Sequence, residues 1–479
     1  MTTDELLASL PFLVLGGAVV LVMLATAIRR HHLMALLLTL LGLAAAFGSL
    51  FTLHTGTGAR RVTALLLVDD YALFFLGLIL LASIAVVLLS FGYLEVLGGA
   101  REEYYLLLLL ATLGSATLIA STHFASFFLG LEILSVSLYA LIAYARGRPL
   151  SVEAGIKYLI LAGTSSAFLL FGMALVYAEL GTMEFGRIGS LISSGNKVPA
   201  LLMMGLTMVI VGIGFKLAVV PFHMWTPDVY QGSPAPATAF VATVSKGAMY
   251  ALLLRFFTPM GIHAHWSLFL VFAIIAVASM VAGNLLALLQ TNVKRILAYS
   301  SIAHLGYLLV PFLAGSVLGI RVAALYLATY FATTLGAFGV VTVLSGGDGD
   351  AENLDTYRGL GRERPWLAGV FAAMLLSLAG LPLTAGFVAK FFLVSSGVGA
   401  ALWVLVVVLV VTSGIGVFYY LRVIAAMYLQ PRPEGAPGAA APSFTWSSGI
   451  VLAVLALVLL WLGIYPSPLL QLIEAMVAL

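Results

Sequence analysis

Apolar runs of about twenty residues recur along almost the whole chain, and no other feature of the sequence constrains the fold as strongly. A helix that crosses a membrane needs roughly 20 apolar residues. By that rule the sequence predicts about fourteen membrane-spanning segments, with ends placed to within a few residues. They lie near 10–28, 33–53, 71–94, 104–121, 124–145, 154–178, 199–231, 235–256, 266–289, 296–317, 321–344, 366–395, 400–428 and 448–465. The predicted fold is an all-α polytopic membrane protein.

The composition supports this fold class and excludes several functions. Of the 479 residues, 62% are hydrophobic and only 9% are charged, whereas a soluble domain needs far more charge on its surface. The sequence contains no cysteine, which excludes thiolate-bound iron–sulfur clusters and disulfides. It also contains no P-loop, GxGxxG or zinc-ligand spacing, so nothing indicates ATP hydrolysis or dinucleotide binding. The first apolar run is too long for the core of a signal peptide, and we interpret it as the first spanning helix.

Two segments, 199–231 and 366–395, are longer than one straight crossing requires, and each contains a proline, Pro221 or Pro382. A helix broken inside lipid survives only where protein or water binds the freed backbone groups. We therefore expect two broken helices whose freed groups hold water beside a neighbouring lysine. Two such helices at matching positions predict two inverted five-helix repeats, formed by segments 4–8 and 9–13.

This repeat pattern divides the chain into four parts. Residues 1–98 would form the first three helices, 99–256 the first repeat, 257–430 the second repeat, and 431–479 a linker, the last helix and a tail. The stretch PRPEGAPGAAAPS at 431–443 is typical of a flexible connection. The tail after Pro466 is expected to lie along the surface as a short amphipathic helix.

Basic residues in the predicted loops indicate the orientation, because inner loops carry an excess of Lys and Arg. If the N-terminus is outside, the inner loops hold Arg29, Arg30, Arg101, Arg146, Arg148, Lys294, Arg295, Arg358, Arg362, Arg364 and Arg432. The outer loops then hold Arg60, Arg61, Arg187, Lys197, Arg255 and Arg321. This bias predicts that both termini lie on the outer side.

The remaining basic residues fall inside the predicted segments: Lys157, Lys216, Lys246, Lys390 and Arg422. A charge at the centre of a bilayer costs about 3 kcal/mol or more, so each of them needs a reason. Lys157 follows Glu153 by four residues near the start of its segment, and we interpret the two as a structural pair. Arg422 lies near a segment end and is interpreted as an anchor or a partner contact. Asp228 is expected to cap the broken helix or to pair locally.

Glu132 and Lys216 are the first candidates for chemistry inside the membrane. Glu132 lies within an apolar segment, and intramembrane acids are functional by default, although it could instead clamp two helices. Burial disfavours a charged lysine and a nearby carboxylate favours it, so Lys216 could exchange its proton near neutral pH. The alternative is a permanent Lys216–Glu132 ion pair that only fixes the packing of the helices.

Three further groups extend this candidate relay. Lys246 lies midway along its segment, where its amine reaches neither surface easily. Lys390 lies nearer a segment end, where its side chain could instead extend to the surface as a snorkelling lysine. His223 and His304 could pass protons in a water-poor channel, or each could be a hydrogen-bonded packing residue. The histidines form no pattern that indicates haem binding.

The run GFKLAVVPFHMWTPDVYQGSPAPATAFVATVSK at 214–246 closely resembles the antiporter-like membrane subunits of respiratory complex I, and in particular its N-type subunit. The stretches NVKRILAYSSIAHLGYLL at 292–309 and GLPLTAGFVAKF at 380–391 also resemble that subunit, and the likeness extends over roughly segments four to thirteen. The resemblance implies a proton pump whose functional residues are a glutamate on the fifth helix and lysines on the seventh, eighth and twelfth. They correspond here to Glu132, Lys216, Lys246 and Lys390.

The resemblance also implies partners, location and a division of labour. The chain would contain no cofactor of its own, and FMN, iron–sulfur clusters and quinone would be bound by other subunits. Its partners would be the other membrane-arm subunits of complex I, including further antiporter-like subunits, in the bacterial inner membrane with both termini periplasmic. In this scheme Lys216 passes a proton through water, and by way of His223 or His304, toward Lys246, and Lys390 exchanges protons with the outer side. The alternatives are a subunit of a sodium/proton antiporter, a purely structural subunit, and a solute symporter, for which the sequence shows no separate substrate pocket.

Overall fold

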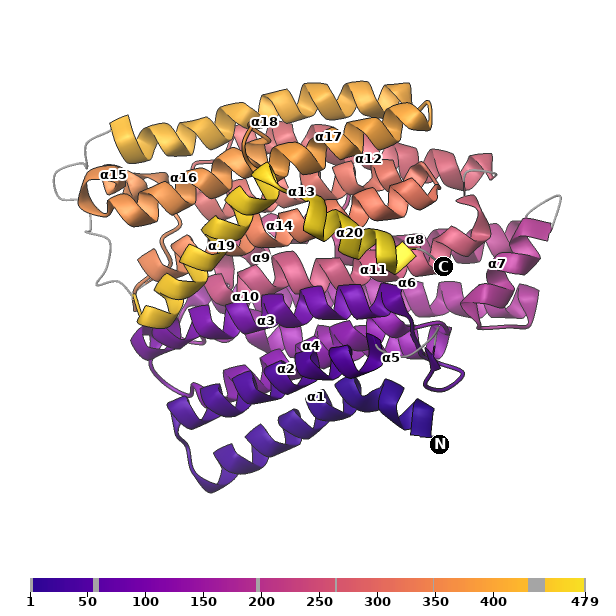
Figure 1. The fold of residues 1–479 in the computed structure, drawn as a ribbon, viewed down its shortest axis with the longest axis horizontal. Coiled ribbons are helices and arrows are strands. Elements are labelled where there is room, and N and C mark those ends of the chain that lie inside the picture. The colour runs from indigo at the N-terminus through magenta and orange to yellow at the C-terminus, as the bar shows by residue number, and fades with distance from the viewer. Residues whose placement is uncertain are drawn as a thin grey trace.

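The computed structural model is a bundle of long helices that run roughly side by side (Figure 1). It describes residues 3–54, 60–194, 199–262, 265–347, 349–429 and 444–477. The long unbroken helices are α1 (Thr3–Ile28), α2 (His32–His54), α3 (Asp70–Leu97), α4 (Glu102–Ala120), α5 (Phe124–Ile142), α6 (Pro149–Leu180), α12 (Trp266–Leu288), α13 (Val293–Leu313), α14 (Val317–Leu344), α18 (Trp403–Leu429) and α19 (Trp446–Ile464). The prediction of an all-α membrane protein is confirmed.

Two helical segments are interrupted where the sequence places a proline. The first consists of α8 (Ala200–Leu217) and α9 (Trp225–Gly232), with Pro221 in the break, and the second of α16 (Pro365–Ala379) and α17 (Ala385–Gly399), with Pro382 in the break. A third segment contains a feature that the sequence did not indicate. There α10 (Ala235–Phe240) passes through a π-helical turn, Val241–Ser245, into α11 (Lys246–Phe257).

Short elements complete the chain. They are the two-residue strands β1 (Arg60–Arg61) and β2 (Leu67–Val68), which pair antiparallel, the helices α7 (Phe185–Ser194), α15 (Leu360–Glu363) and α20 (Ser467–Val477), and 3₁₀ turns at Thr258–Met260 and Leu354–Tyr357. The tail does form a helix, and Ile473 and Met476 of α20 are buried against the bundle. The predicted connection at 431–443 lies outside the described residues.

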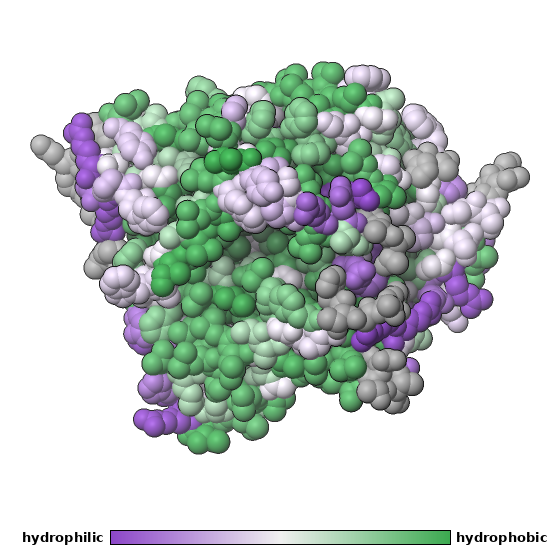
Figure 2. Space-filling model, in the orientation of Figure 1, coloured by the Kyte–Doolittle hydropathy of each residue, from purple (hydrophilic) through white to green (hydrophobic). Residues whose placement is uncertain are grey.

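Thirteen of the described helical runs are long and apolar enough to span a membrane, and α16 and α17 are shorter apolar helices. Figure 2 shows the corresponding surface: hydrophobic residues cover the middle of the visible face, and hydrophilic residues gather toward the two ends of the helices. The predicted count of fourteen crossings, the two inverted repeats and the four-part division stay predictions.

The interior of the bundle is formed by α10–α11, α13 and α14, in which nearly every residue is buried. The surrounding helices α1, α2, α6, α18 and α19 expose large apolar side chains such as Leu41, Ile160 and Val407. Helix α1 begins and α20 ends toward the same side of the bundle, at the right of Figure 1. This position agrees with termini on one side of the membrane, and their periplasmic location stays a prediction.

Candidate functional site

Lys216 lies in the last turn of α8, and its side chain is only 2% exposed. Its amine donates hydrogen bonds to the Ser135 hydroxyl of α5 at 2.7 Å and to the Tyr158 hydroxyl of α6 at 3.1 Å. The nitrogen also lies 5.0 Å from the centre of the Tyr158 ring, a cation–π distance. The buried amine is therefore bound entirely by neutral groups.

The break after α8 is closed by protein groups. Ala218 ends the helix in the left-handed region with φ 59°. The indole of Trp225 donates to the Phe215 carbonyl at 3.0 Å, and the Ser279 hydroxyl accepts the Val220 amide at 2.9 Å. These two freed backbone groups are bound by protein side chains. The expectation that freed groups hold water beside Lys216 stays a prediction.

Glu132 lies on the same side of α5 as Ser135, one turn earlier. It is half-buried and accepts a hydrogen bond from the Ser166 hydroxyl of α6 at 2.7 Å. No ion pair joins the described side chains of Glu132 and Lys216. The alternative of a permanent ion pair was therefore wrong, and the carboxylate acts on the amine only from a distance.

Lys246 follows the π-helical turn and is 1% exposed. Its amine donates to the Ser301 hydroxyl of α13 at 2.7 Å and lies 5.2 Å from the centre of the Tyr230 ring of α9. Ser301 also accepts a hydrogen bond from the Tyr330 phenol of α14 at 2.7 Å. The amine points into the bundle, so it does not snorkel to a surface.

Lys390 lies on α17, and its side chain turns back across the second break. Its amine donates to the carbonyls of Leu378 and Ala379 at 2.8 and 2.9 Å and to the Ser413 hydroxyl of α18 at 2.8 Å. These carbonyls belong to the last turn of α16, where backbone acceptors have no partner within the helix. The snorkelling alternative was wrong, because the amine binds the carbonyl end of the preceding helix.

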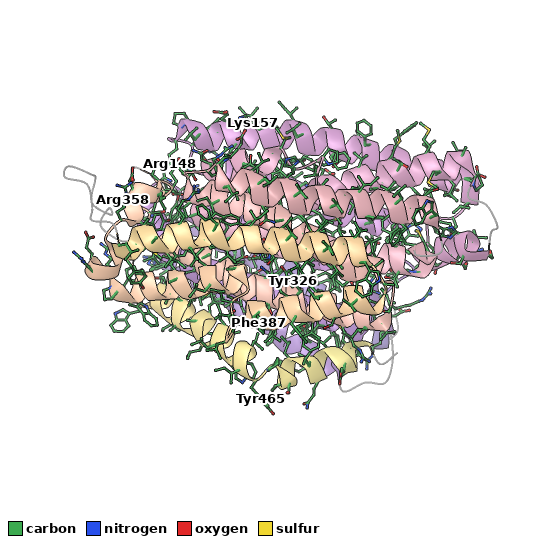
Figure 3. All side chains as sticks on the ribbon, turned by 90° about the horizontal axis from the view of Figure 1, so that it is seen from above. Arg148, Lys157, Tyr326, Arg358, Phe387 and Tyr465 are labelled. Carbon is green, nitrogen blue, oxygen red and sulfur yellow. The ribbon has the colours of Figure 1, made fainter. Side chains whose placement is uncertain are left out.

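His304 of α13 is 4% exposed and is hydrogen-bonded to Tyr326 of α14 at 2.7 Å and to Tyr420 of α18 at 3.3 Å. Figure 3 places Tyr326 among the inner helices. A cavity of about 10 Å³, lined among others by His304, Tyr330 and Lys390, lies beside this group. That volume is at the lower limit for one water molecule. His304 thus lines a cavity with Lys390, and none of its hydrogen bonds among the described residues is to Lys216 or Lys246. Its role between these two lysines stays a prediction.

His223 lies in the first break and is 8% exposed. Its Nδ1 is buried without a hydrogen-bond partner among the described residues. The structure does not bring this histidine into hydrogen-bond contact with any of the three relay lysines. Its role in the relay stays a prediction.

Helix α9 connects the surroundings of Lys216 and Lys246. At its start, the Trp225 ring lies 4.9 Å from the Tyr158 ring, which binds the Lys216 amine. One and a half turns later, the Tyr230 ring lies over the Lys246 amine. The second half of the broken helix therefore contacts Lys246 directly through Tyr230 and reaches Lys216 only through Tyr158.

A separate ionic cluster lies at one end of the bundle. It joins α3, α9 and α13 to the segments that precede α6 and follow α14. The Asp350 carboxylate, 6% exposed, accepts from Arg148 at 2.8 Å, from Lys294 at 2.7 Å and from the Tyr93 hydroxyl at 2.8 Å. Burial alone would raise the pKa of Asp350, but Lys294 and Arg148 together hold that pKa below its usual range. Lys294 was predicted as a loop residue, yet it is fully buried and also donates to the carbonyls of Gln231 and Ser233.

Arg255, a second predicted loop cation, has a side chain that is only 9% exposed. It forms a two-pronged ion pair with Asp69 at 2.6 and 3.0 Å, and its Nε donates to the Ile119 carbonyl. Both misassigned cations are removed from water by acidic partners far away in the sequence. They therefore contribute to folding and give little information about orientation.

The interpretation of Lys157 as structural is supported by its contacts. It pairs with Glu153 at 2.7 Å and with Asp228 at 2.8 Å, and Asp228 also binds Arg295 of α13 at 2.8 Å. Figure 3 shows Lys157 at the edge of the bundle. Asp228 therefore pairs with distant residues, and the prediction that it pairs locally was wrong. Arg422 donates to the carbonyls of Leu288 and Gln290 at the end of α12, so it fastens one helix to another.

Sequence reasoning missed the hydroxyl groups that bind the amines, which are those of Ser135, Tyr158, Ser301 and Ser413, and it missed Tyr330, which binds Ser301. Serine and tyrosine within apolar segments were the available signal, but such residues are common and their partners lie on other helices. No cluster of three potential metal ligands occurs in the part of the chain that the structure describes. The absence of a bound cofactor stays a prediction.

The fold and these amines define a class of membrane proteins, the antiporter-like subunits with broken helices and buried lysines. Residues 121–416 match the family model described as NADH:quinone oxidoreductase/Mrp antiporter, transmembrane. A relative named NADH-quinone oxidoreductase subunit N from Nitrosospira multiformis is 54% identical, covering 98% of this chain and 96% of the relative. A relative of the same name from Ectopseudomonas mendocina is 48% identical, covering 100% and 98%. The chain belongs to the family of NADH-quinone oxidoreductase N subunits.

Solved structures agree with this family. A chain of respiratory complex I from Thermus thermophilus matches with a TM-score of 0.81 and 34% identity, covering 96% of this chain and 98% of that one. A chain of an archaeal membrane-bound sulfane sulfur reductase matches with a TM-score of 0.82 and 26% identity, covering 100% and 97%. A chain of the Mrp complex from a Dietzia species has a TM-score of 0.85 at 22% identity, covering 100% and 97%, and shows likeness of fold alone.

Proposed function

We propose that this chain is a membrane-arm subunit of NADH:quinone oxidoreductase and translocates protons without carrying out redox chemistry itself. The observation that carries the proposal is the set of three amines, on Lys216, Lys246 and Lys390, that are bound by hydroxyl and carbonyl groups and by no carboxylate. An amine fixed in an ion pair tends to keep its proton. One held only by neutral groups in a poorly hydrated interior can release it.

The proton route follows the order of these groups through the bundle. Glu132 lies one turn from Ser135, which binds the Lys216 amine, so a change of charge at Glu132 alters the proton affinity of Lys216 without direct contact. Lys216 passes its proton past the aromatic side chains of α9 to Lys246. Lys390 exchanges protons with the outer side of the membrane.

The remaining assignments complete the proposal. Iron–sulfur clusters belong to other subunits, because this chain has no cysteine to ligate one. We assign FMN and quinone to other subunits as well. Its partners are the other membrane-arm subunits and the lipid bilayer. It resides in the bacterial inner membrane, with both termini on the periplasmic side. A change of charge in a neighbouring subunit drives the proton transfer in this chain.

Two alternatives lead to different experimental outcomes. A sodium/proton antiporter subunit would share the fold, as the likeness to the Mrp chain illustrates, but its deletion would leave NADH-driven quinone reduction intact. A structural subunit would use buried charges only to join helices, as the Asp350 cluster does. It would tolerate neutral lysine substitutions once the complex is assembled.

The test is Lys216→Ala in the assembled enzyme, assayed in inverted membrane vesicles for NADH-driven quinone reduction and for proton uptake. We expect proton translocation to fall more than tenfold with the subunit still incorporated. The matched control is Lys157→Ala, which removes an amine that is 42% exposed and paired at the surface. Parental pumping in Lys216→Ala would refute the assigned role.

A further inference from the structure

Ser301 lies where three buried side chains from three different elements meet. Its hydroxyl accepts hydrogen bonds from the Lys246 amine and from the Tyr330 phenol, both at 2.7 Å. The Tyr230 hydroxyl lies farther away, at 3.4 Å. Lys246, Ser301 and Tyr330 are each at most 3% exposed, so bulk water does not reach this junction.

Tyr330 also faces the cavity that His304 and Lys390 line. Its ring centre lies 5.5 Å from that of His304. Tyr330 therefore binds Ser301 with its hydroxyl and also borders the cavity next to Lys390. In the described part of the chain, Ser301 is the only residue that hydrogen-bonds the Lys246 amine.

We propose that the hydroxyls of Ser301 and Tyr330 form the proton connection between Lys246 and the cavity shared by His304 and Lys390. This inference rests on the proposed function, since it assigns two transfer residues to the same relay. The two hydroxyls replace the water chain that this part of the route would otherwise need.

The hydrogen-bond directions explain how the connection works while Lys246 is protonated. An ammonium group has only donors, so Ser301 must accept from it. Ser301 then accepts two bonds, from Lys246 and Tyr330, and its own proton points toward Tyr230. In this state the hydroxyl has no proton directed at the lysine, and transfer toward Lys246 is blocked.

When Lys246 loses its proton, its nitrogen gains a lone pair, and the Ser301 hydroxyl can rotate to donate to it. The transfer then balances as a relay. The Ser301 O–H bond breaks as a new N–H bond forms on Lys246, Ser301 takes the Tyr330 proton, and Tyr330 takes one from a water molecule in the cavity that it shares with Lys390. Lys390 then gives its proton to that water. Each oxygen ends with the number of protons it began with. Lys246 has gained one proton and Lys390 has lost one, and the reverse sequence carries a proton the other way.

The contacts of Lys390 fit the end of the connection that holds the proton. Two of its three acceptors are backbone carbonyls, which can only accept, so they favour the charged amine. Lys246 is bound by a hydroxyl, which suits either state of the amine. The Lys390 amine is therefore bound mainly by groups that only accept hydrogen bonds, and the Lys246 amine by a group that can accept or donate. The hydroxyls between them can also accept or donate.

The experiment uses Tyr330→Phe, Ser301→Ala, the double variant and Ser301→Thr in the assembled complex. Tyr330→Phe keeps the ring and removes only the hydroxyl. We expect each single variant to lower NADH-driven proton translocation more than tenfold. The double variant should be no worse than the worse single variant, because both remove one path. Ser301→Thr, which keeps the hydroxyl, should restore at least half of the rate, and its solvent deuterium isotope effect should match that of the parent.

The control is Tyr250→Phe, which removes an equally buried phenol one turn beyond Lys246 on α11. That phenol donates to the Leu308 carbonyl and is not part of the route. Subunit incorporation is measured for every variant. Parental pumping in Tyr330→Phe and Ser301→Ala, with Lys246→Ala inactive, would overturn the connection alone. Parental pumping in Lys246→Ala as well would overturn the proposed function.

Discussion

For the ionic cluster around Asp350, we predict that the loss of stability on substitution depends on how much charge is left without a partner of opposite sign. The cluster contains two cations, Arg148 and Lys294, and one anion. Lys294→Met leaves one charge of each sign in contact. Asp350→Asn leaves both cations without an anion, although the side chain keeps almost the same size. We therefore expect the change of the acid to be the more destabilising of the two.

The magnitude follows from the contacts of each side chain. Asp350 accepts three hydrogen bonds, two of them from charged groups. Removing one partner of a buried ion pair costs about 3–5 kcal/mol, because it leaves charge without compensation. Lys294→Met loses its bonds to two carbonyls and to the acid. The Ser233 carbonyl still accepts from Thr238, and the acid still accepts from Arg148 and Tyr93. The acceptor left unpaired is the Gln231 carbonyl, at a cost of about 1–3 kcal/mol.

The free energy of unfolding can be measured by titrating the purified chain with SDS in mixed lipid–detergent micelles, with tryptophan fluorescence as the signal. The amount of each variant incorporated into the membrane-bound complex is a second readout. A loss below about 1 kcal/mol for Asp350→Asn, or a larger loss for Lys294→Met, would show that counting the uncompensated charges is the wrong argument.

Two further predictions concern pH and helix packing. Because the folded-state pKa of Asp350 is held below its unfolded value of about 3.9, its contribution to stability is complete above that pH. It is lost as the pH falls through the lower folded pKa, so Asp350→Asn should flatten the acid side of the stability curve measured by SDS titration. At the second break, a Cβ on Gly386 would overlap the Ser377 carbonyl oxygen, so Gly386→Ala should separate α16 from α17 and reduce complex assembly several-fold on a native gel. Gly369→Ala, where a Cβ meets nothing within 4 Å, should assemble normally, and equal levels of the two variants would contradict this packing argument.

Much of the site was predictable because depth in a membrane can be read from the sequence. A lysine in the middle of an apolar run has no route to water, so the burial of Lys216 and Lys246 followed from position alone. The breaks at Pro221 and Pro382 followed from proline chemistry, since proline removes a helical donor. Position near a segment end misled for Lys390, whose amine turns inward to free carbonyls.

The partners of these lysines could not be predicted, because they depend on which helices touch. Ser135 is 81 residues from Lys216 in the sequence, and Ser301 is 55 from Lys246. Lys294 illustrates the opposite error. Its polar neighbours are typical of a loop, but the chain after α14 folds back and buries Lys294 against Asp350. The residues next to a position in the sequence predict its exposure to solvent only where no distant segment of the chain covers it.

The contact between Lys390 and the carbonyl end of α16 links chemistry to mechanics. Its charged amine clasps two carbonyls of one half-helix while its backbone belongs to the other. In the proposed relay, each loss of the proton from this amine weakens the two hydrogen bonds, and each gain strengthens them. The proton carried by that relay would therefore also change how firmly the two halves of the broken helix hold together.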